Sequence, residues 1–465
     1  MTGREFDVIV IGAGAVGENA ADYAAKAGLE VAIVEAELLG GECSYWACMP
    51  SKALLRTGHA VAAVRRLPGT TATFDPAAVF ARRDSFTHNW DDASQVAWAE
   101  GAGLTVLRGY ARITGERTVA IQGGETLTAR HAVVVCTGSV PVRPPVDGLD
   151  TVRTWSSREA TSAKEAPPRL GVLGGGVVGC ELAQAFRRLG SEVVLVQHGP
   201  RLLAAMEPVA GERVAAALRA EGVDVRLDTQ LDRVAADGAG IALHLPGGET
   251  IVVDELLVAT GRRPNTADVG LDTVGLEPGE TLTVDDSGLV DGVDGQWLYA
   301  AGDVTGRAPL THQGKYDARI AGAAVGARAT GAAVDTGPWG EHAATADHAA
   351  VPQVVFTDPE VAFVGRTEEQ ARAAGLDVRV VDIPFAVAGS SLQADSYGGA
   401  ARMVVDESRG LLVGVTFVGQ DVAELLHAAT VAVVGEVPLH RLWHAVPAYP
   451  TMSEIWLRLL EAHRT

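Results

Sequence analysis

The feature that most constrains the fold is a phrase that occurs twice: an apolar run, a Gly-x-Gly-x-x-Gly turn and a helical stretch. The first copy, FDVIVIGAGAVGENAADYAAKAG, has its turn at Gly12, Gly14 and Gly17, and the second, RLGVLGGGVVGCELAQAFRRLG, has it at Gly174, Gly176 and Gly179. A glycine turn between a strand and a helix is where a dinucleotide pyrophosphate binds, at the helix N-terminus. One such turn alone is also compatible with a ligand-free glycine turn, but the duplication predicts two Rossmann-like units.

Each unit continues through a β-rich stretch into a similar phrase, VVVCTGSVP in the first and LLVATGRRP in the second. Glu35, at the end of the second predicted strand, is suited to hydrogen-bond ribose hydroxyls. The first unit is longer, and its extra residues fall over a cysteine segment and the helical stretch after it. A third element, GQWLYAAGDVTG, places Asp303 just past a strand. We therefore predict one dinucleotide-binding domain over 1–150, completed by 276–345, and a second over 151–275.

The C-terminal part has a different pattern. Beyond residue 345 the strand-like runs VPQVVF, ARMVVD and GLLVGVTFVG, with a helix over 422–434, predict an antiparallel α+β domain over 346–465. The expected fold class is α/β, with two Rossmann-like dinucleotide-binding domains followed by this C-terminal α+β domain.

Composition excludes several classes of partner. The 465 residues carry a formal net charge of −20, a field that repels a nucleic-acid backbone or an anionic membrane surface. No uncharged apolar run of about 18 residues occurs, and the N-terminus enters a strand-like stretch without a basic region or cleavage site. We therefore expect a cytoplasmic protein whose partners include neither nucleic acid nor a membrane. Four cysteines are too few for a disulfide framework, so a close pair needs a chemical explanation.

That pair lies in GGECSYWACMPSKALLR, at Cys43 and Cys48. In an ideal helix, residues five apart have Cα atoms about 8.6 Å apart, beyond the ~7 Å limit for a disulfide, so a bridge requires a distorted first turn. Gly40 and Gly41 supply backbone freedom for that distortion, and a Cys43 at the helix N-terminus is favoured as thiolate. The alternatives are a metal site, which lacks nearby His or Cys ligands and is not expected, and inert buried thiols.

Together these motifs resemble the pyridine nucleotide-disulfide oxidoreductases, the flavoprotein family of glutathione reductase, dihydrolipoamide dehydrogenase and mercuric reductase. The resemblance covers essentially the whole chain, and its most specific part is GGxCxxxxCxPSK. It implies a homodimer in which the C-terminal α+β domain is the dimerisation domain. It implies FAD on the first unit and a nicotinamide cofactor on the second. The implied FAD-binding residues are Gly12, Gly14, Gly17, Glu35, Gly138 and Asp303, and those for the nicotinamide cofactor are Gly174, Gly176 and Gly179.

The resemblance also implies a reaction, that of an NAD(P)H:disulfide-type flavoprotein oxidoreductase. Hydride passes from the nicotinamide to FAD, and the flavin reduces a Cys43–Cys48 disulfide. Cys48 then rests as a thiolate against the flavin, and Cys43 attacks the acceptor. Lys52, one turn after Cys48, would approach the flavin and pair with Glu181, which offsets the desolvation of the lysine. A solvated helix charge is the alternative for Lys52. Arg262 matches the family phrase ATGRxPN and is expected among the cofactor-binding residues, with packing at a domain junction as the alternative.

The C-terminal signature departs from the family pattern. Where the family has HPTxSE, with a His–Glu pair that acts across the dimer interface, this chain reads YPTMSE from Tyr449 to Glu454. Tyrosine is a poor base near neutral pH but an adequate hydrogen-bond donor, so we expect an altered acceptor site, with His444 as an alternative base. Mercuric reductases resemble this chain in placing Tyr there, but the C-terminal cysteine pair that they carry is missing here.

The sequence leaves more than one candidate for the nicotinamide cofactor and for the electron acceptor. The second unit carries Gln197 and His198 where an NAD-preferring relative has an acidic residue, and Arg201 is close enough in sequence to contact a 2′-phosphate. We favour NADPH, the alternative being NADH with Gln197 bonded to a bare ribose. The electrons pass to an unidentified small-molecule acceptor. Alternatives are a reductase of quinones, metal ions or other acceptors with an auxiliary disulfide, and a flavin-containing redox sensor or scaffold with negligible turnover.

Overall fold

The computed structural model describes residues 3–465, which form two compact units that we describe separately. The first unit contains the described residues up to Pro50 together with Asp84–Val142 and Arg262–His348. The second contains Ser51–Arg83, Arg143–Gly261 and Ala349–Thr465. Within residues 3–465, no helix is both long enough and apolar enough to cross a membrane.

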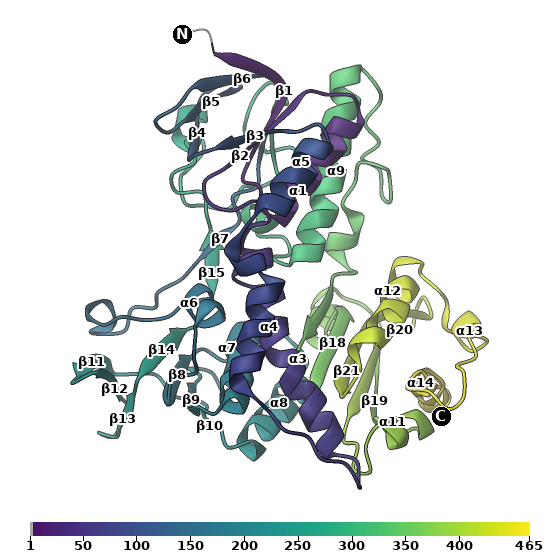
Figure 1. Cartoon of the computed structure of the whole chain (residues 1–465). Coiled ribbons are helices and arrows are strands. Elements are labelled where there is room, and N and C mark those ends of the chain that lie inside the picture. The colour runs from purple at the N-terminus through teal and green to yellow at the C-terminus, as the bar shows by residue number, and fades with distance from the viewer. Residues whose placement is uncertain (1–2) are drawn as a thin grey trace. The chain divides into compact units, whose positions relative to one another are not determined.

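A mostly parallel sheet forms the centre of the first unit (Figure 1). Its order is β3-β2-β1-β6-β5-β4, with β16 beside β6. Its strands are β1 (Arg4–Ile11), β2 (Val31–Glu35), β3 (Thr105–Arg108), β4 (Ala111–Gly115), β5 (Thr118–Ile121), β6 (Thr126–Val135) and β16 (Leu298–Ala300). The central strand β1 is buried on both faces from Val8 to Ile11, as central parallel strands are. The strand β16 comes late in the chain and pairs in parallel with β6, so a distant segment adds a strand to this sheet.

Helices α1 (Ala15–Lys26) and α9 (Thr311–Thr330) pack side by side against this sheet (Figure 1). A Cβ added at Gly322 would lie 2.6 Å from the carbonyl oxygen of Ala20, so glycine permits the close approach of the two helices. The 3₁₀ turn η4 (Gly302–Thr305) links β16 to the segment before α9. The first glycine turn and the residues after Asp303 therefore belong to one packed layer.

The extra length of the first phrase lies between β2 and β3. It forms α2 (Gly41–Tyr45), α3 (Cys48–Arg65), α4 (Pro76–Phe86), the turn η1 (His88–Trp90) and α5 (Ala93–Gly101). The boundary between the two units falls inside α3, after Pro50. Both redox-candidate cysteines thus lie in the first unit, and Lys52 in the second.

The two similar phrases that end the repeats pair with each other. They end in the short strands β7 (Ser139–Pro141) and β15 (Arg262–Pro264), which form an antiparallel two-stranded sheet with Ser139 opposite Pro264. The two phrases are alike in sequence, and their last three residues, 139–141 and 262–264, are paired within the first unit.

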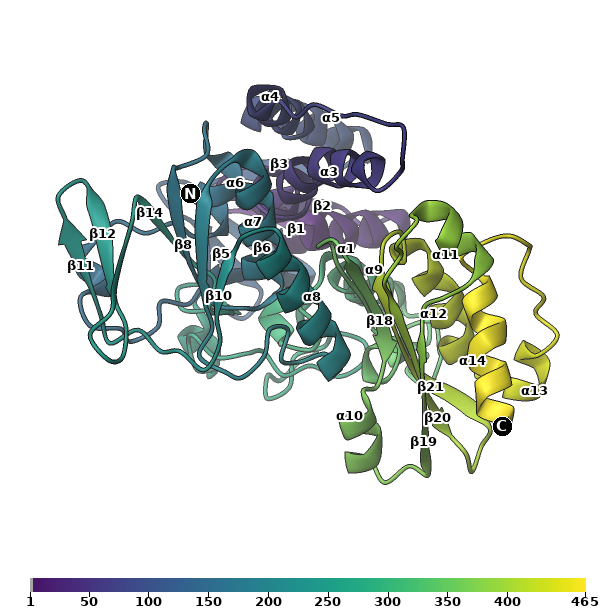
Figure 2. The same cartoon turned by 90° about the horizontal axis from the view of Figure 1, so that it is seen from below.

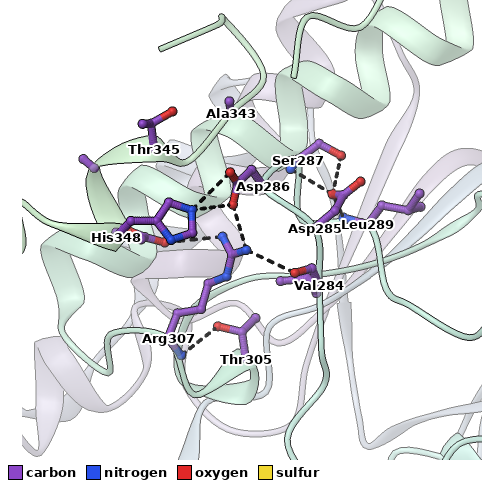
Figure 3. A network of polar contacts seen from close by, with 12 residues as sticks. Val284, Asp285, Asp286, Ser287, Leu289, Thr305, Arg307, Ala343, Thr345 and His348 are labelled. Carbon is purple, nitrogen blue, oxygen red and sulfur yellow. Dashed lines mark hydrogen bonds and ion pairs between the residues drawn. The ribbon is translucent and has the colours of Figure 1, made fainter. Parts of the chain in front are cut away.

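The last residues of the first unit are tied to it by a polar network (Figure 3). The ring of His348, at the end of η5 (Thr345–His348), lies 2.9 Å from Asp286 Oδ1, and Arg307 donates to the same oxygen at 2.9 Å. Burial alone would raise the pKa of Asp286, but His348 and Arg307 hold it below its usual range. This ion cluster fixes the segment after α9 to the loop before β16.

The second unit contains a parallel sheet in the order β10-β9-β8-β14. Its strands are β8 (Arg169–Leu173), β9 (Glu192–Val196), β10 (Asp224–Arg226) and β14 (Glu255–Val258), and its helices are α6 (Ser157–Ser162), α7 (Val177–Leu189) and α8 (Pro208–Ala220). A small antiparallel sheet joins β11 (Arg233–Asp237), β12 (Gly240–His244) and β13 (Thr250–Val253). Leu54 and Leu55 of α3 share a core with Phe186 of α7, so most of α3 packs with this unit.

The chain ends in an antiparallel sheet of order β17-β18-β21-β20-β19. It comprises β17 (Pro352–Val355), β18 (Glu360–Gly365), β19 (Val378–Pro384), β20 (Ala400–Asp406) and β21 (Leu411–Gly419). Helices α12 (Leu426–Val434) and α14 (Glu454–Arg464) cover one face of it (Figure 2), with α10 (Glu368–Ala373), α11 (Ala388–Gln393) and α13 (Leu439–Leu442) nearby in the chain. The predicted α/β class with two Rossmann-like units and a C-terminal α+β part is confirmed, while the boundaries at 150, 275 and 345 stay predictions.

Candidate redox site and nucleotide-binding turns

The first glycine turn joins β1 to α1 and has no room for a side chain at Gly12 or Gly17. Gly12 has φ +95°, and a Cβ added there would lie 2.5 Å from the carbonyl oxygen of Cys136. A Cβ on Gly17 would lie 1.8 Å from the carbonyl oxygen of Gly12. Gly14 is the N-cap of α1 and has no side chain with which to cap the helix. Backbone N–H groups at a glycine-lined helix N-terminus fit a pyrophosphate.

The second glycine turn, between β8 and α7, repeats this geometry. Gly174 has φ +110°, and a Cβ there would lie 2.4 Å from the carbonyl oxygen of Ala259. A Cβ on Gly179 would lie 1.9 Å from the carbonyl oxygen of Gly174, whereas around Gly176, the N-cap of α7, there is open space. The chain therefore contains two matching cradles for a phosphate group.

The residues at the ends of β2 and β9 also occupy matching positions. Glu35 Oε2 accepts a hydrogen bond from the Ala13 backbone N–H at 2.7 Å, and Gln197 Oε1 accepts one from the Gly175 N–H at 2.7 Å. Burial raises the pKa of Glu35. The second polar atom of Gln197 is an amide donor, whereas a glutamate in its place would offer an acceptor.

The other two candidates for nicotinamide selectivity lie in the loop after β9. His198 is exposed, and Arg201 is half-buried with its Nη2 donating to the carbonyl oxygen of Ala204 at 2.9 Å. Both are close to Gln197 in the chain, and their contact with a phosphate stays a prediction.

A chain of polar contacts connects Asp303 to Arg262 within the first unit. Ser139 Oγ donates to Asp303 Oδ2, and Arg262 Nε donates to Ser139 Oγ at 2.7 Å. Arg262 Nη2 also donates to Glu42 Oε2 at 2.5 Å. Gly138, with φ +70°, precedes this cluster. These contacts favour the packing alternative for Arg262, because its donors are directed at protein groups beside the cysteine segment.

The cysteine segment is a helix interrupted between the two cysteines. Cys43 lies in the short helix α2, and Cys48 is the first residue of α3. Between them the chain leaves helical geometry at Trp46, with φ −138°, and Gly40 and Gly41 enter α2 with φ +100° and +59°. The distortion that a disulfide requires is therefore present. Cys43 lies near the start of the short helix α2, and Cys48 lies at the N-terminus of the longer helix α3, so the dipole of α3 acts on Cys48.

The thiols of Cys43 and Cys48 interact with each other. The neighbouring Cys48 thiol and burial raise the pKa of the Cys43 thiol, against the opposite influence of Thr311 and Lys315. Cys48 Sγ lies 3.2 Å from Thr311 Oγ1, at the start of α9. Neither Thr311 nor Lys315 was predicted from the sequence. The sequence signal that pointed toward them is the helical stretch that follows the Asp303 element.

A buried carboxyl group, also missed, lies on the first turn of α1. Glu18 is 9% exposed, and its Oε1 has no hydrogen-bond partner among residues 3–465. Burial raises the pKa of Glu18 to about 7, although Lys315 acts in the opposite direction. A charged residue directly after a glycine turn gave no sign of this burial.

The predicted ion pair of Lys52 and Glu181 is present in the second unit. Lys52 Nζ lies 2.7 Å from Glu181 Oε2, and Glu181 is only 2% exposed. The other carboxylate oxygen of Glu181 accepts the backbone N–H of Phe356 at 2.9 Å, and Lys52 Nζ lies 5.1 Å from the centre of the Phe356 ring. Glu181 therefore orients the lysine and compensates its charge.

The residues of the altered C-terminal signature differ in exposure. Tyr449 is 78% exposed, and His444 is exposed as well. Glu454 begins α14, is buried, and accepts the backbone N–H of Gly389 at 3.2 Å. The tyrosine thus presents its phenol at the surface of the chain, while the glutamate is held by its own domain.

Comparison with known proteins shows extensive similarity. The family model described as pyridine nucleotide-disulphide oxidoreductase matches residues 6–326, and the model of that family's dimerisation domain matches residues 351–459. The chain is 34% identical to a mercuric reductase of Shigella flexneri over 470 residues, covering 96% of this chain and 79% of that protein. It is 34% identical to a dihydrolipoyl dehydrogenase of Thermus scotoductus over 473 residues, covering 99% and 97%. A solved Cu(II) complex of the HOCl-induced flavoprotein disulfide reductase RclA from Escherichia coli superposes with a TM-score of 0.82, at 27% identity, over 98% of this chain and 99% of that one.

Proposed function

The chain belongs to the pyridine nucleotide-disulphide oxidoreductases, NAD(P)H-dependent flavoproteins with a dimerisation domain, and we propose that its redox disulfide is Cys43–Cys48. The observation that carries this proposal is the break between α2 and α3, which brings the two thiols into contact across a sequence spacing that a continuous helix would keep apart.

The first glycine turn fits FAD, because Gly12 and Gly17 leave no side chain in the cradle and Gly14 leaves the first turn of α1 uncapped by a side chain. Glu35 and Asp303 complete the proposed binding set. When bound, FAD supplies electron transfer between the nicotinamide and the disulfide. The second turn, with Gly174, Gly176 and Gly179, would hold the nicotinamide cofactor.

The two sulfurs have different proposed roles. Cys48 is the thiolate, because it lies at the N-terminus of the long helix α3 and 3.2 Å from the hydroxyl of Thr311, which can donate to it. Cys43 is the proposed attacking sulfur, and the neighbouring Cys48 thiol and burial raise the pKa of its thiol. Lys52 is the proposed cation beside the flavin, with Glu181 fixing its position.

The experiment that tests this assignment is two-electron reduction followed by absorbance spectroscopy. Contact between a Cys48 thiolate and the flavin is expected to give a long-wavelength charge-transfer band. Cys43→Ser should retain that band at neutral pH, and Cys48→Ser should remove it. A band that survives in Cys48→Ser would reverse the roles of the two sulfurs.

We propose that the acceptor is not a dithiol-type disulfide, because Tyr449 stands where the family has its histidine base. Metal ions are the first class of acceptor to test. One similar protein is named a mercuric reductase, and one similar solved structure is a Cu(II) complex of the disulfide reductase RclA. Steady-state turnover with a panel of metal ions, quinones and disulfides separates the candidates. Negligible turnover with all of them would favour a redox sensor or scaffold.

We further propose that NADPH is the preferred nicotinamide cofactor. Gln197 is held by the Gly175 N–H and directs a donor, rather than a carboxylate, toward the ribose position. Gln197→Glu should therefore invert the preference toward NADH, because a carboxylate binds ribose hydroxyls and repels a 2′-phosphate. Arg201→Ala should weaken the preference, measured as kcat/KM for each cofactor. A wild-type kcat/KM at least tenfold higher with NADH, about 1.4 kcal/mol, would contradict this proposal.

A further inference from the structure

A short segment of the first unit has an unusual backbone conformation. His88, Asn89 and Trp90 have consecutive φ angles of +48°, +52° and +59°, although none of them is glycine. Residues with a side chain avoid this left-handed region, asparagine least. Such a conformation persists where surrounding contacts enforce it, and segments of this kind are often found at functional sites.

The left-handed turn forms hydrogen bonds with the cysteine segment. Trp90 Nε1 donates to the carbonyl oxygen of Tyr45 at 3.1 Å, and the Tyr45 hydroxyl donates to the carbonyl oxygen of Asp91 at 3.5 Å. Tyr45 is 1% exposed and lies between Cys43 and Cys48 in the chain. The turn is therefore hydrogen-bonded to Tyr45, the last residue of α2.

The same segment is also hydrogen-bonded to the chain before Cys43. Asp92 Oδ2 accepts the backbone N–H of Leu39 at 2.8 Å and a hydrogen bond from Arg108 at 2.6 Å. Arg108 in turn donates to the carbonyl oxygen of Glu37 at 2.7 Å. We call residues 88–92 with Arg108 the clamp, because they hold the backbone on both sides of Cys43.

We propose that the clamp positions Cys43 against Cys48 and thereby sets the reduction potential of their disulfide. Reduction adds two electrons and breaks the S–S bond, leaving two sulfurs that take up protons according to their pKa values. The closer the fold holds the two sulfurs after reduction, the more the disulfide is favoured at equilibrium, because the effective concentration of one thiol at the other is higher. Trp90 and Arg108 are thus positioning residues, and the inference rests on the proposed function, which makes Cys43–Cys48 the redox pair.

The test is the equilibrium between the enzyme disulfide and a dithiothreitol redox buffer. The FAD-loaded protein is equilibrated at a series of buffer ratios, and free thiols at Cys43 and Cys48 are counted by alkylation and mass spectrometry. Trp90→Phe keeps an aromatic side chain but removes the Nε1 donor. The equilibrium constant for reduction of its disulfide should therefore rise about threefold to tenfold, and tenfold corresponds to about 30 mV. Arg108→Ala, at the exposed end of the clamp, should shift it in the same direction.

Trp98→Phe is the matched control, because Trp98 is an exposed tryptophan on α5 outside the clamp, and it should keep the wild-type potential. FAD content and melting temperature are measured alongside, since a purely structural role would lower these without changing the potential. Wild-type potentials in both Trp90→Phe and Arg108→Ala would overturn the clamp; should Trp90→Phe not fold, the potential of Arg108→Ala decides alone. A wild-type protein that forms no Cys43–Cys48 disulfide would instead overturn the proposed function.

Discussion

Among single residues, Glu18 has the environment that most changes its chemistry. Its carboxyl is buried on the glycine-turn helix α1, and its pKa is raised to about 7 from an ordinary value of 4.5. The folded protein therefore binds this proton more tightly than the unfolded chain does. The resulting stability is fully present below pH 4.5 and is lost as the pH rises through about 7.

Glu18→Gln removes this titration and is expected to raise the stability at pH 8. The shift is worth about 3 kcal/mol at most, because each pKa unit corresponds to about 1.4 kcal/mol. Near pH 4.5 the variant and the wild type should unfold alike, since both carry a neutral side chain there. Melting temperatures of the two proteins at both pH values check this. If the difference in melting temperature between variant and wild type does not grow with pH, ionisation of Glu18 does not destabilise the folded protein, and the prediction is wrong.

At the scale of elements, the second strand–turn–helix unit has two glycines with separable functions, Gly176 at the N-cap of α7 and Gly179 within α7. Gly179→Ala should cost about 1–3 kcal/mol, because its Cβ would collide with the Gly174 carbonyl oxygen and push α7 away from β8. Gly176→Ala meets open space in the protein, so stability should be kept while KM for the nicotinamide cofactor rises about tenfold or more, the new methyl group occupying the phosphate cradle.

Thermal unfolding and steady-state kinetics distinguish the two variants. FAD content is the internal control, since the first glycine turn is untouched in both. An unchanged KM in Gly176→Ala would show that the nicotinamide cofactor does not bind at the N-terminus of α7.

At the scale of the whole molecule, the dimerisation domain raises the question of which chain supplies Tyr449 to an active site. Tyr449→His should restore part of the activity toward lipoamide or glutathione disulfide, because an imidazolium can protonate the leaving thiolate, an effect of about 10²- to 10⁴-fold. Reduction of the bound flavin by the nicotinamide cofactor should be unchanged, as it needs no base at the thiols. Rapid turnover of either disulfide by the wild type would contradict the altered acceptor site.

Mixed dimers test whether the site is shared between subunits. One chain carries both Cys43→Ser and Tyr449→His, and its partner carries neither substitution. If the site is shared, the intact Cys43 of one chain meets the new histidine of the other, and up to half of the gain in disulfide reduction remains. If each site belongs to a single chain, the gain is lost.

The sequence alone determined the features that depend on local pattern. The glycine turns at Gly12 and Gly174, the CxxxxC segment and the strands β17, β20 and β21 of the C-terminal sheet depend on residue spacing and backbone freedom over a few neighbouring positions, so they could be predicted. The strands β18 and β19 of the same sheet were not predicted. The pairing of Lys52 with Glu181 was also expected, although only through the family resemblance.

Tertiary structure decided the contacts that join distant parts of the chain. Thr311 reaches Cys48 across 263 positions, and Trp90 reaches Tyr45 across 45. The pKa of Glu18 likewise depends on what covers it rather than on its sequence neighbours. No local sequence pattern predicts these contacts or this burial, because they arise only when separate elements pack and exclude water from the groups between them.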